Sequence, residues 1–67
     1  MYETVHIAHD DPNELAKMVD SVTNDLRDDP AVRLVKDTQY TVSQRWRLDG
    51  GQGAAVHHAW ITCWRQP

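Results

Sequence analysis

The sequence predicts an α+β fold, with one amphipathic helix packed on a three- or four-stranded, mostly antiparallel sheet in the order β-α-β-β or β-α-β-β-β. Three observations predict it. Apolar residues recur with a helical period over residues 12–28, and side chains alternate with a strand period over residues 31–48. Glycines then mark a turn before another strand-like segment. The chain has 67 residues, which is enough for one domain spanning residues 1–67.

Residues 2–8 are rich in β-branched and aromatic types and are predicted to form the first strand. The helix that follows has distinct start signals, because Asp11 suits the N-cap, Pro12 the first helical position and Glu14 the third position of a capping box. It is expected to end before Pro30, because the residue preceding a proline avoids helical angles. Its apolar stripe consists of Leu15, Met18, Val19, Val22 and Leu26.

Residues 31–48 are too long for one ordinary strand, and the polar run Lys36-Asp37-Thr38 predicts a break. We therefore expect strands near 31–36 and 39–48, with the even positions buried and the odd positions exposed. Residues 49–53 are predicted to be a hairpin turn. The even positions expected to be buried include Val32, Leu34, Tyr40, Val42, Trp46 and Leu48.

The last predicted strand, residues 54–65, pairs with 39–48 and is apolar on both of its faces. Such a strand lies in the middle of a sheet or is covered on its second face by another molecule. A single helix covers only one face of the sheet, so the second face is expected to meet a second copy or a partner protein. One face carries Val56, Trp60 and Trp64, and the other carries Ala59, Ile61 and Cys63.

Charge is distributed unevenly along the chain. Residues 1–32 hold eight acidic and two basic side chains, whereas residues 33–67 hold two acidic and five basic ones. The predicted helix is therefore acidic and the predicted sheet mildly basic. This asymmetry indicates either an interaction surface or two surfaces that neutralise each other within the fold.

The composition also indicates a compartment. A lone cysteine, Cys63, cannot form an internal disulfide and is typical of a reducing environment. The first residues lack the basic and apolar regions of a signal peptide, and no apolar run approaches the roughly 20 residues of a membrane helix. These features predict a cytoplasmic protein that does not contact membranes.

The chain opens with Met1-Tyr2-Glu3, begins its helical stripe at Glu14-Leu15 and closes with the aromatic segment 60–67. This layout resembles the small β-α-β-β domains of unknown function of the DUF1737 and DUF4177 type. Where those domains carry Gly-Trp-Glu-Leu after the helix, this chain has residues 31–34, Ala-Val-Arg-Leu. The resemblance implies a fold and no established chemistry.

Four histidines are the candidate metal ligands: His6, His9, His57 and His58. Adjacent strand residues point to opposite faces, so only one of His57 and His58 can join the first two, and no zinc-type spacing occurs. Cys63 is expected to be a small buried hydrophobe rather than a nucleophile. We therefore expect no catalytic residues, no metal and no cofactor, and hence no enzyme.

The sequence favours a small accessory or regulatory protein that binds another protein, of the kind that phages and mobile elements encode as modulators, and that also self-associates. One alternative is a single-stranded nucleic-acid-binding module with arginines and aromatic rings on a sheet face. A second alternative is a small metal-binding domain. The residues predicted to contact a partner are Trp60, Trp64, Arg45, Arg47 and Arg65 on the sheet and Asp20, Asp25, Asp28 and Asp29 on the helix.

Overall fold

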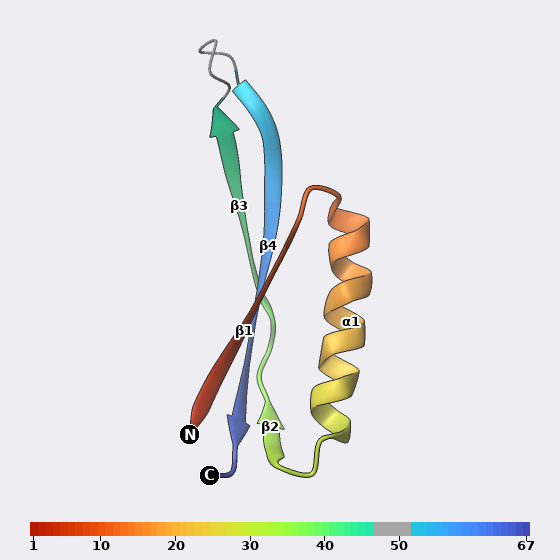
Figure 1. Cartoon of the computed structure of the whole chain (residues 1–67), viewed down its shortest axis with the longest axis vertical. Coiled ribbons are helices and arrows are strands. Elements are labelled where there is room, and N and C mark those ends of the chain that lie inside the picture. The colour runs from red at the N-terminus through yellow and green to blue at the C-terminus, as the bar shows by residue number, and fades with distance from the viewer. Residues whose placement is uncertain (47–51) are drawn as a thin grey trace.

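The computed structural model describes residues 1–46 and 52–67, and of residues 45, 46 and 52 it describes the backbone only. Figure 1 shows the helix beside the sheet, which confirms the predicted α+β class. The helix spans residues 12–28, as predicted. The elements are β1 (Tyr2–His9), α1 (Pro12–Asp28), β2 (Val32–Val35), β3 (Gln39–Trp46) and β4 (Gln52–Arg65).

Strand β4 is the middle of the sheet and pairs antiparallel with all three other strands. On one side it pairs with β1. On the other side its C-terminal part pairs with β2 and its N-terminal part with β3, so β2 and β3 follow one another along the same edge. Strands β1 and β2 therefore run parallel to each other with β4 between them, and α1 makes the crossover that parallel strands require. This central position is one of the two alternatives that the apolar residues on both faces of β4 predicted.

The start of α1 follows the predicted N-cap but not the predicted capping box. The Asp11 carboxylate accepts a hydrogen bond from the backbone N–H of Asn13 at 2.8 Å. The Asp11 N–H donates instead to Nδ1 of His9 at 2.9 Å, and Glu14 pairs with Lys17 at 3.2 Å. The capping-box prediction is wrong because the histidine that ends β1 already occupies the N–H that Glu14 would have accepted from.

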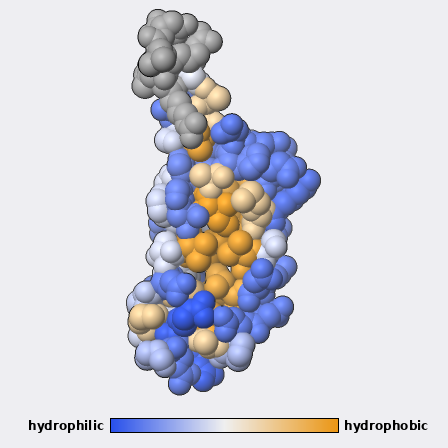
Figure 2. All heavy atoms as spheres, in the orientation of Figure 1, coloured by the Kyte–Doolittle hydropathy of each residue, from blue (hydrophilic) through white to orange (hydrophobic). Residues whose placement is uncertain are grey.

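The core lies between α1 and the face of the sheet that α1 covers. Figure 2 shows its apolar atoms as a band between the helix and the strands. Met18, which the sequence assigned to the apolar stripe, is 39% exposed and lies outside this core. Because adjacent core positions of β4 are two residues apart, this face of β4 carries the odd-numbered residues. The buried cluster consists of Ile7, Leu15, Val19, Leu26, Ala59, Ile61 and Cys63.

The prediction that the even positions of residues 31–48 are buried holds in part for Val32, which packs against the core, and is wrong for the next apolar ones. The side chain of Trp46 lies outside the described residues. Leu34 is 52%, Tyr40 59% and Val42 61% exposed. A register shift between Val32 and Leu34 turns Leu34 away from α1 and packs Val35 against the core in its place. Figure 1 shows that the end of β3 and the start of β4 extend beyond the helix. Val56 in this part of β4 is nevertheless buried, at 6% exposed, outside the cluster that packs on α1. Arg47, Leu48 and most of the predicted turn lie outside the described residues.

Gln52 and Gly53, which the sequence assigned to the turn, belong to β4. In the part of the chain that the structure describes, α1 is neither long nor apolar enough to cross a membrane.

Candidate functional site

The sheet has a second face that α1 does not cover, and we call it the outer sheet face. Ile61 and Cys63 point to the core, so their neighbours in β4 point away from it. The pairing of strands extends this face across β1 and β3, because residues directly opposite each other share a face. The outer sheet face includes Tyr2, Thr4, His6, Leu34, Lys36, Thr41, Ser43, His58, Trp60, Thr62 and Trp64.

Trp60 is fixed on this face by contacts to both neighbouring strands. Its ring stacks on His6 of β1, with centroids 4.0 Å apart and planes 13° from parallel. Its indole N–H donates to Oγ1 of Thr41 in β3 at 3.1 Å. His58 joins the same cluster, because its Nδ1 lies 2.8 Å from Nε2 of His6 and its Nε2 lies 2.7 Å from Oγ of Ser43. Trp60 nevertheless keeps 38% of its surface exposed.

Trp64 forms a second aromatic cluster nearer the N-terminus. It meets Tyr2 of β1 edge to face, with ring centroids 4.9 Å apart. Nζ of Lys36 lies 4.5 Å from the centre of the Tyr2 ring, a cation–π geometry. Leu34 pairs with Trp64 from the other side of β4. Trp64 is 38%, Leu34 52% and Tyr2 58% exposed, so a continuous apolar surface crosses three strands.

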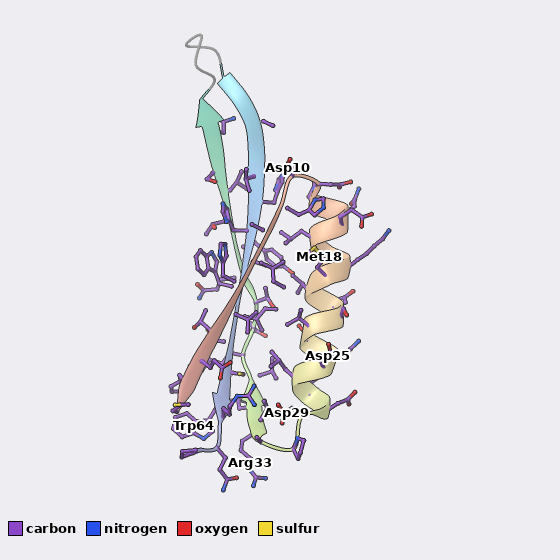
Figure 3. The ribbon with its side chains drawn as sticks, in the orientation of Figure 1. Asp10, Met18, Asp25, Asp29, Arg33 and Trp64 are labelled. Atoms are coloured by element: carbon purple, nitrogen blue, oxygen red, sulfur yellow. The ribbon has the colours of Figure 1, made fainter. Side chains whose placement is uncertain are left out.

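The outer sheet face differs in charge from the rest of the molecule. Among the described residues of β1, β3 and β4, the outward positions contain no carboxylate. The carboxylates gather on the other side instead, along α1 and its flanks. Figure 3 shows the contrast: Asp25 lies on α1, whereas Trp64 lies at the far side of the sheet from the helix. The predicted separation of charge between helix and sheet therefore holds for the outer sheet face.

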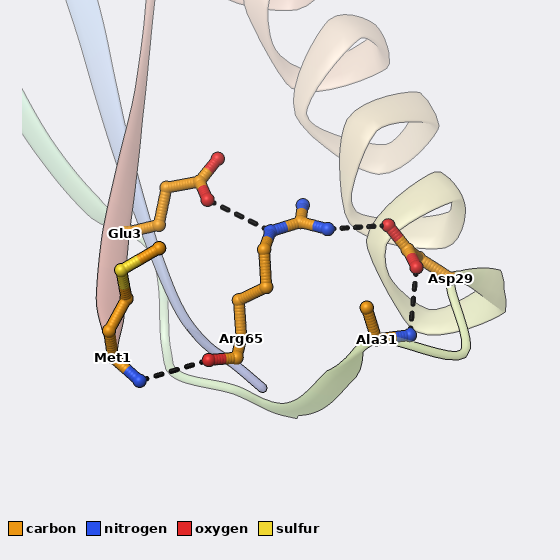
Figure 4. A network of polar contacts seen from close by, with 5 residues as sticks. All are labelled: Met1, Glu3, Asp29, Ala31 and Arg65. Atoms are coloured by element: carbon orange, nitrogen blue, oxygen red, sulfur yellow. Dashed lines mark hydrogen bonds and ion pairs between the residues drawn. The ribbon is translucent and has the colours of Figure 1, made fainter. Parts of the chain in front are cut away.

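The prediction that Arg65 shares a binding surface with Trp60 and Trp64 is wrong about its face, because Arg65 is not on the outer sheet face. It shares the helix-covered face with Ile61 and Cys63 and joins three elements (Figure 4). Its Nε donates to Glu3 of β1 at 2.9 Å, and its Nη1 donates to Asp29 at the end of α1 at 2.8 Å. Its backbone carbonyl accepts from the N-terminal amine of Met1 at 2.9 Å. Arg65 thus ties the helix end to the sheet.

Asp29 is a partner of Arg65 and belongs to no free acidic surface. Its carboxylate accepts from Arg65 and from the backbone N–H of Ala31 at 2.9 Å. The hydrogen bond from Arg65, followed by the one from Ala31, holds the pKa of the Asp29 carboxyl below its ordinary value. Asp20, Asp25 and Asp28 are exposed on α1 as predicted.

The lowered pKa of Asp29 predicts how stability depends on pH. A carboxyl whose pKa is lower in the folded than in the unfolded chain adds stability above the unfolded pKa, and that stability is lost as pH falls through the folded pKa. We expect the melting temperature to fall below about pH 4, the ordinary range of aspartate. Asp29→Asn should lower the melting temperature at pH 7 and reduce its fall below pH 4. If the melting temperatures of the wild type and Asp29→Asn fell by the same amount between pH 7 and pH 3, this role of Asp29 would be contradicted.

The two remaining arginines of the predicted surface cannot be placed with the others. The side chain of Arg45 and the whole of Arg47 lie outside the described residues. Of the sheet residues predicted to contact a partner, the structure therefore brings Trp60 and Trp64 onto one face and moves Arg65 to the other.

The histidines divide between the two faces of the sheet. His6 and His58 meet on the outer sheet face, whereas His57 pairs with His9 on the helix side. Within the described residues, no group of three or more histidine, cysteine and carboxylate side chains converges as a metal site would require. Cys63 is fully buried, as expected of a small hydrophobe.

Ser43, His58 and His6 form a chain of hydroxyl, imidazole and imidazole, the order in which a base and an orienting group activate a serine. Ser43 lies exposed on the open sheet, whereas a cavity of about 350 Å³ lies between α1 and residues 35–40. An acyl group bound in that cavity would be on the other side of the sheet from Ser43. The absence of catalytic residues stays a prediction.

Sequence reasoning missed Tyr2, Thr41, Ser43 and Leu34 as parts of the outer sheet face. The alternation of residues 2–8 was the available signal for Tyr2, because it put Val5 and Ile7 on one face and the even residues on the other. Thr41 and Ser43 required the register of β3 against β4, which the sequence does not contain locally.

No family model, no curated protein and no solved structure matches this chain. The resemblance to the small β-α-β-β domains of unknown function therefore stays a prediction.

Proposed function

We propose that this chain is a small accessory protein that binds a partner protein through the outer sheet face. The observation that carries this proposal is a pair of tryptophans, each 38% exposed, on a sheet face that α1 does not cover. Large exposed apolar patches on small proteins mark interaction sites. Tryptophan is also the residue type that most often dominates the binding energy of an interface.

The fixed positions of both tryptophans support a binding role. Trp60 is held by His6 and Thr41, and Trp64 by Tyr2, so little side-chain freedom remains to be lost when a partner binds. Ordering a mobile side chain at an interface costs about 0.5–1.5 kcal/mol, and a ring that is already ordered avoids this cost. The surface is therefore preorganised for contact.

Charge indicates the chemistry of the partner. The outer sheet face offers Lys36 and two histidines and, among its described positions, no carboxylate. We infer a protein surface with aliphatic side chains at its centre and carboxylates at its rim, because complementary charge favours the correct encounter. In this proposal the chain regulates its partner by occupying the partner's surface. One copy of the chain occupies one binding site.

Binding of single-stranded nucleic acid is less well supported by the same surface. Base stacking requires an open ring face, and His6 already occupies one of the two faces of the Trp60 ring. Arg65 is paired with Asp29 and Glu3 on the opposite side of the sheet and offers no phosphate contact there. We therefore place protein binding first.

The test uses peptides as probes. A random-peptide phage library would be selected on the wild-type chain, and the enriched peptides would be synthesised and titrated by calorimetry. We expect enriched sequences with an aliphatic or aromatic centre and flanking acidic residues. Trp64→Thr, which keeps a strand-forming residue, should weaken their binding by about 30-fold or more, the effect of losing an interface hot spot.

Tyr40→Thr is the matched control, because Tyr40 is an exposed aromatic residue on the other face of the sheet. Its peptide affinity should equal that of the wild type. Equal loss in both variants, or binding that depends on Asp25 and Asp28 of the helix instead, would refute the outer sheet face as the binding site. Tight binding of an oligothymidine probe with a steep salt dependence would favour the nucleic-acid alternative.

A further inference from the structure

Strand β1 has a free edge among the residues that the structure describes. Within residues 1–46 and 52–67 it pairs with β4 alone, over eight residues and without a register shift. Met1 and Arg65 exchange two backbone hydrogen bonds, each 2.9 Å long, at the end of this pairing. Because bonded and non-bonded pairs alternate along an antiparallel ladder, the backbone groups of the odd residues point to β4. Those of Tyr2, Thr4, His6 and Ala8 point to the open edge.

The two edges of the sheet differ in their protection against pairing. The opposite edge is broken at residues 36–38 between two strands, has a register shift within β2 and carries Lys36 and Asp37 at the break. Interruptions, bulges and lysines are the devices by which proteins prevent edge-to-edge association. Strand β1 contains no proline, glycine, lysine or arginine and no shift. Its edge therefore remains competent to pair with another strand.

We propose that β1 pairs antiparallel with β1 of a second copy of this chain around a two-fold axis at Val5. This proposal is independent of the proposed function. An isologous contact of this kind closes as a dimer and cannot continue into a fibre. The two sheets become one, with both outer sheet faces on the same side.

The register follows from the outward backbone groups. Only outward residues can form the two-bond pairs of an antiparallel ladder, so even residues must face even residues. With the axis at Val5, Tyr2 faces Ala8 and Thr4 faces His6 of the other copy, and all four outward residues of each chain are paired. Moving the axis to His6 leaves Tyr2 unpaired and sets two histidines opposite each other, and moving it to Thr4 leaves Ala8 unpaired.

The register makes a specific cross-linking prediction. The two Val5 residues face each other as a non-bonded pair, whose Cα atoms lie about 4.5 Å apart, within the range of a disulfide. Val5→Cys should therefore form a covalent dimer under mild oxidation. Thr4→Cys should not, because Thr4 faces His6. The wild type carries only the buried Cys63 and should form no covalent dimer, which controls for disulfides formed by that thiol.

Light scattering after size exclusion gives the second readout. The wild type should reach twice 7.7 kDa as its concentration rises. Ala8→Pro should remain a monomer, because proline removes an N–H that points to the open edge and none that pairs with β4. Ala8→Thr keeps that N–H and should dimerise like the wild type.

A monomeric wild type at every concentration, a dimeric Ala8→Pro, or a covalent dimer of Thr4→Cys in place of Val5→Cys would each overturn the proposal. Circular dichroism establishes that each variant is folded. None of these readouts depends on peptide binding, so failure of this proposal and failure of the proposed function are distinguishable.

Discussion

Replacing Ile61 by alanine is expected to destabilise this chain by about 2–5 kcal/mol, the usual cost of truncating a large buried aliphatic side chain. Ile61 is fully buried at the centre of β4 and belongs to the cluster that joins α1 to the sheet. A chain of this length has a total stability of only about 3–10 kcal/mol, taking roughly 0.05–0.15 kcal/mol per residue. The substitution therefore removes a large share of that stability.

Urea denaturation followed by circular dichroism measures this loss. Leu34→Ala is the matched control, because it removes a similar aliphatic group from a side chain that is 52% exposed on the outer sheet face. We expect Leu34→Ala to change stability by about 0.5 kcal/mol or less, as exposed substitutions do. Equal losses in the two variants would mean that the core does not lie on the α1 side of β4.

The second large effect concerns the side of α1 that faces the sheet. Val19→Lys is expected to unfold the chain, because an unpaired charge in a buried position costs about 3 kcal/mol or more. Val19 is 5% exposed, and its environment in the core consists of aliphatic side chains and Cys63. Circular dichroism should show loss of both helix and sheet, because α1 and the strands share one core.

Met18→Lys tests the orientation of the helix directly. Met18 precedes Val19 on α1 and is labelled in Figure 3. It is 39% exposed. Its substitution by lysine should leave the fold intact and change the melting temperature little. If Met18→Lys unfolded the chain and Val19→Lys did not, the helix would be rotated about its axis relative to the sheet.

The helix was predictable because its signals are local. Asp11 and Pro12 define its start through contacts within one turn, and Pro30 terminates it regardless of the rest of the chain. The central position of β4 was only one of two alternatives. Apolar residues on both of its faces were compatible with a middle strand or with a strand covered by another molecule, and the strand order could not be predicted from the sequence.

The burial of residues 31–48 was not predictable from alternation alone. The register shift in β2 depends on how Val32, Leu34 and Val35 pair with β4, whose residues lie far away in the sequence. A shift by one residue exchanges the two faces of a strand. Tyr40 lies on the helix side of the sheet, where it lines a cavity beside Val19 and Asp20 of α1 and stays 59% exposed.

The position of Arg65 could have been found by counting. It has an odd number, like Ile61 and Cys63, which alternation along a strand places on one face. The contact between Ser43, His58 and His6 could not have been found in this way. It joins three strands and depends on the register of β4 against β1 and on its register against β3. Alternation along β4 therefore predicts that the two tryptophans share the outer sheet face. It does not predict which residues of the neighbouring strands contact them.

The sheet order has a consequence for how the chain acquires its structure. The strand to which every other strand pairs is β4, and it follows the others in the chain. Until β4 has been synthesised, β1 and β2 have no neighbour to bond to, and α1 has no sheet to cover. Pairing Tyr2 with Trp64 also closes a loop that contains nearly all the other elements, and such distant contacts slow folding. Folding should thus begin only after translation of β4, and removal of this strand should leave an unstructured chain.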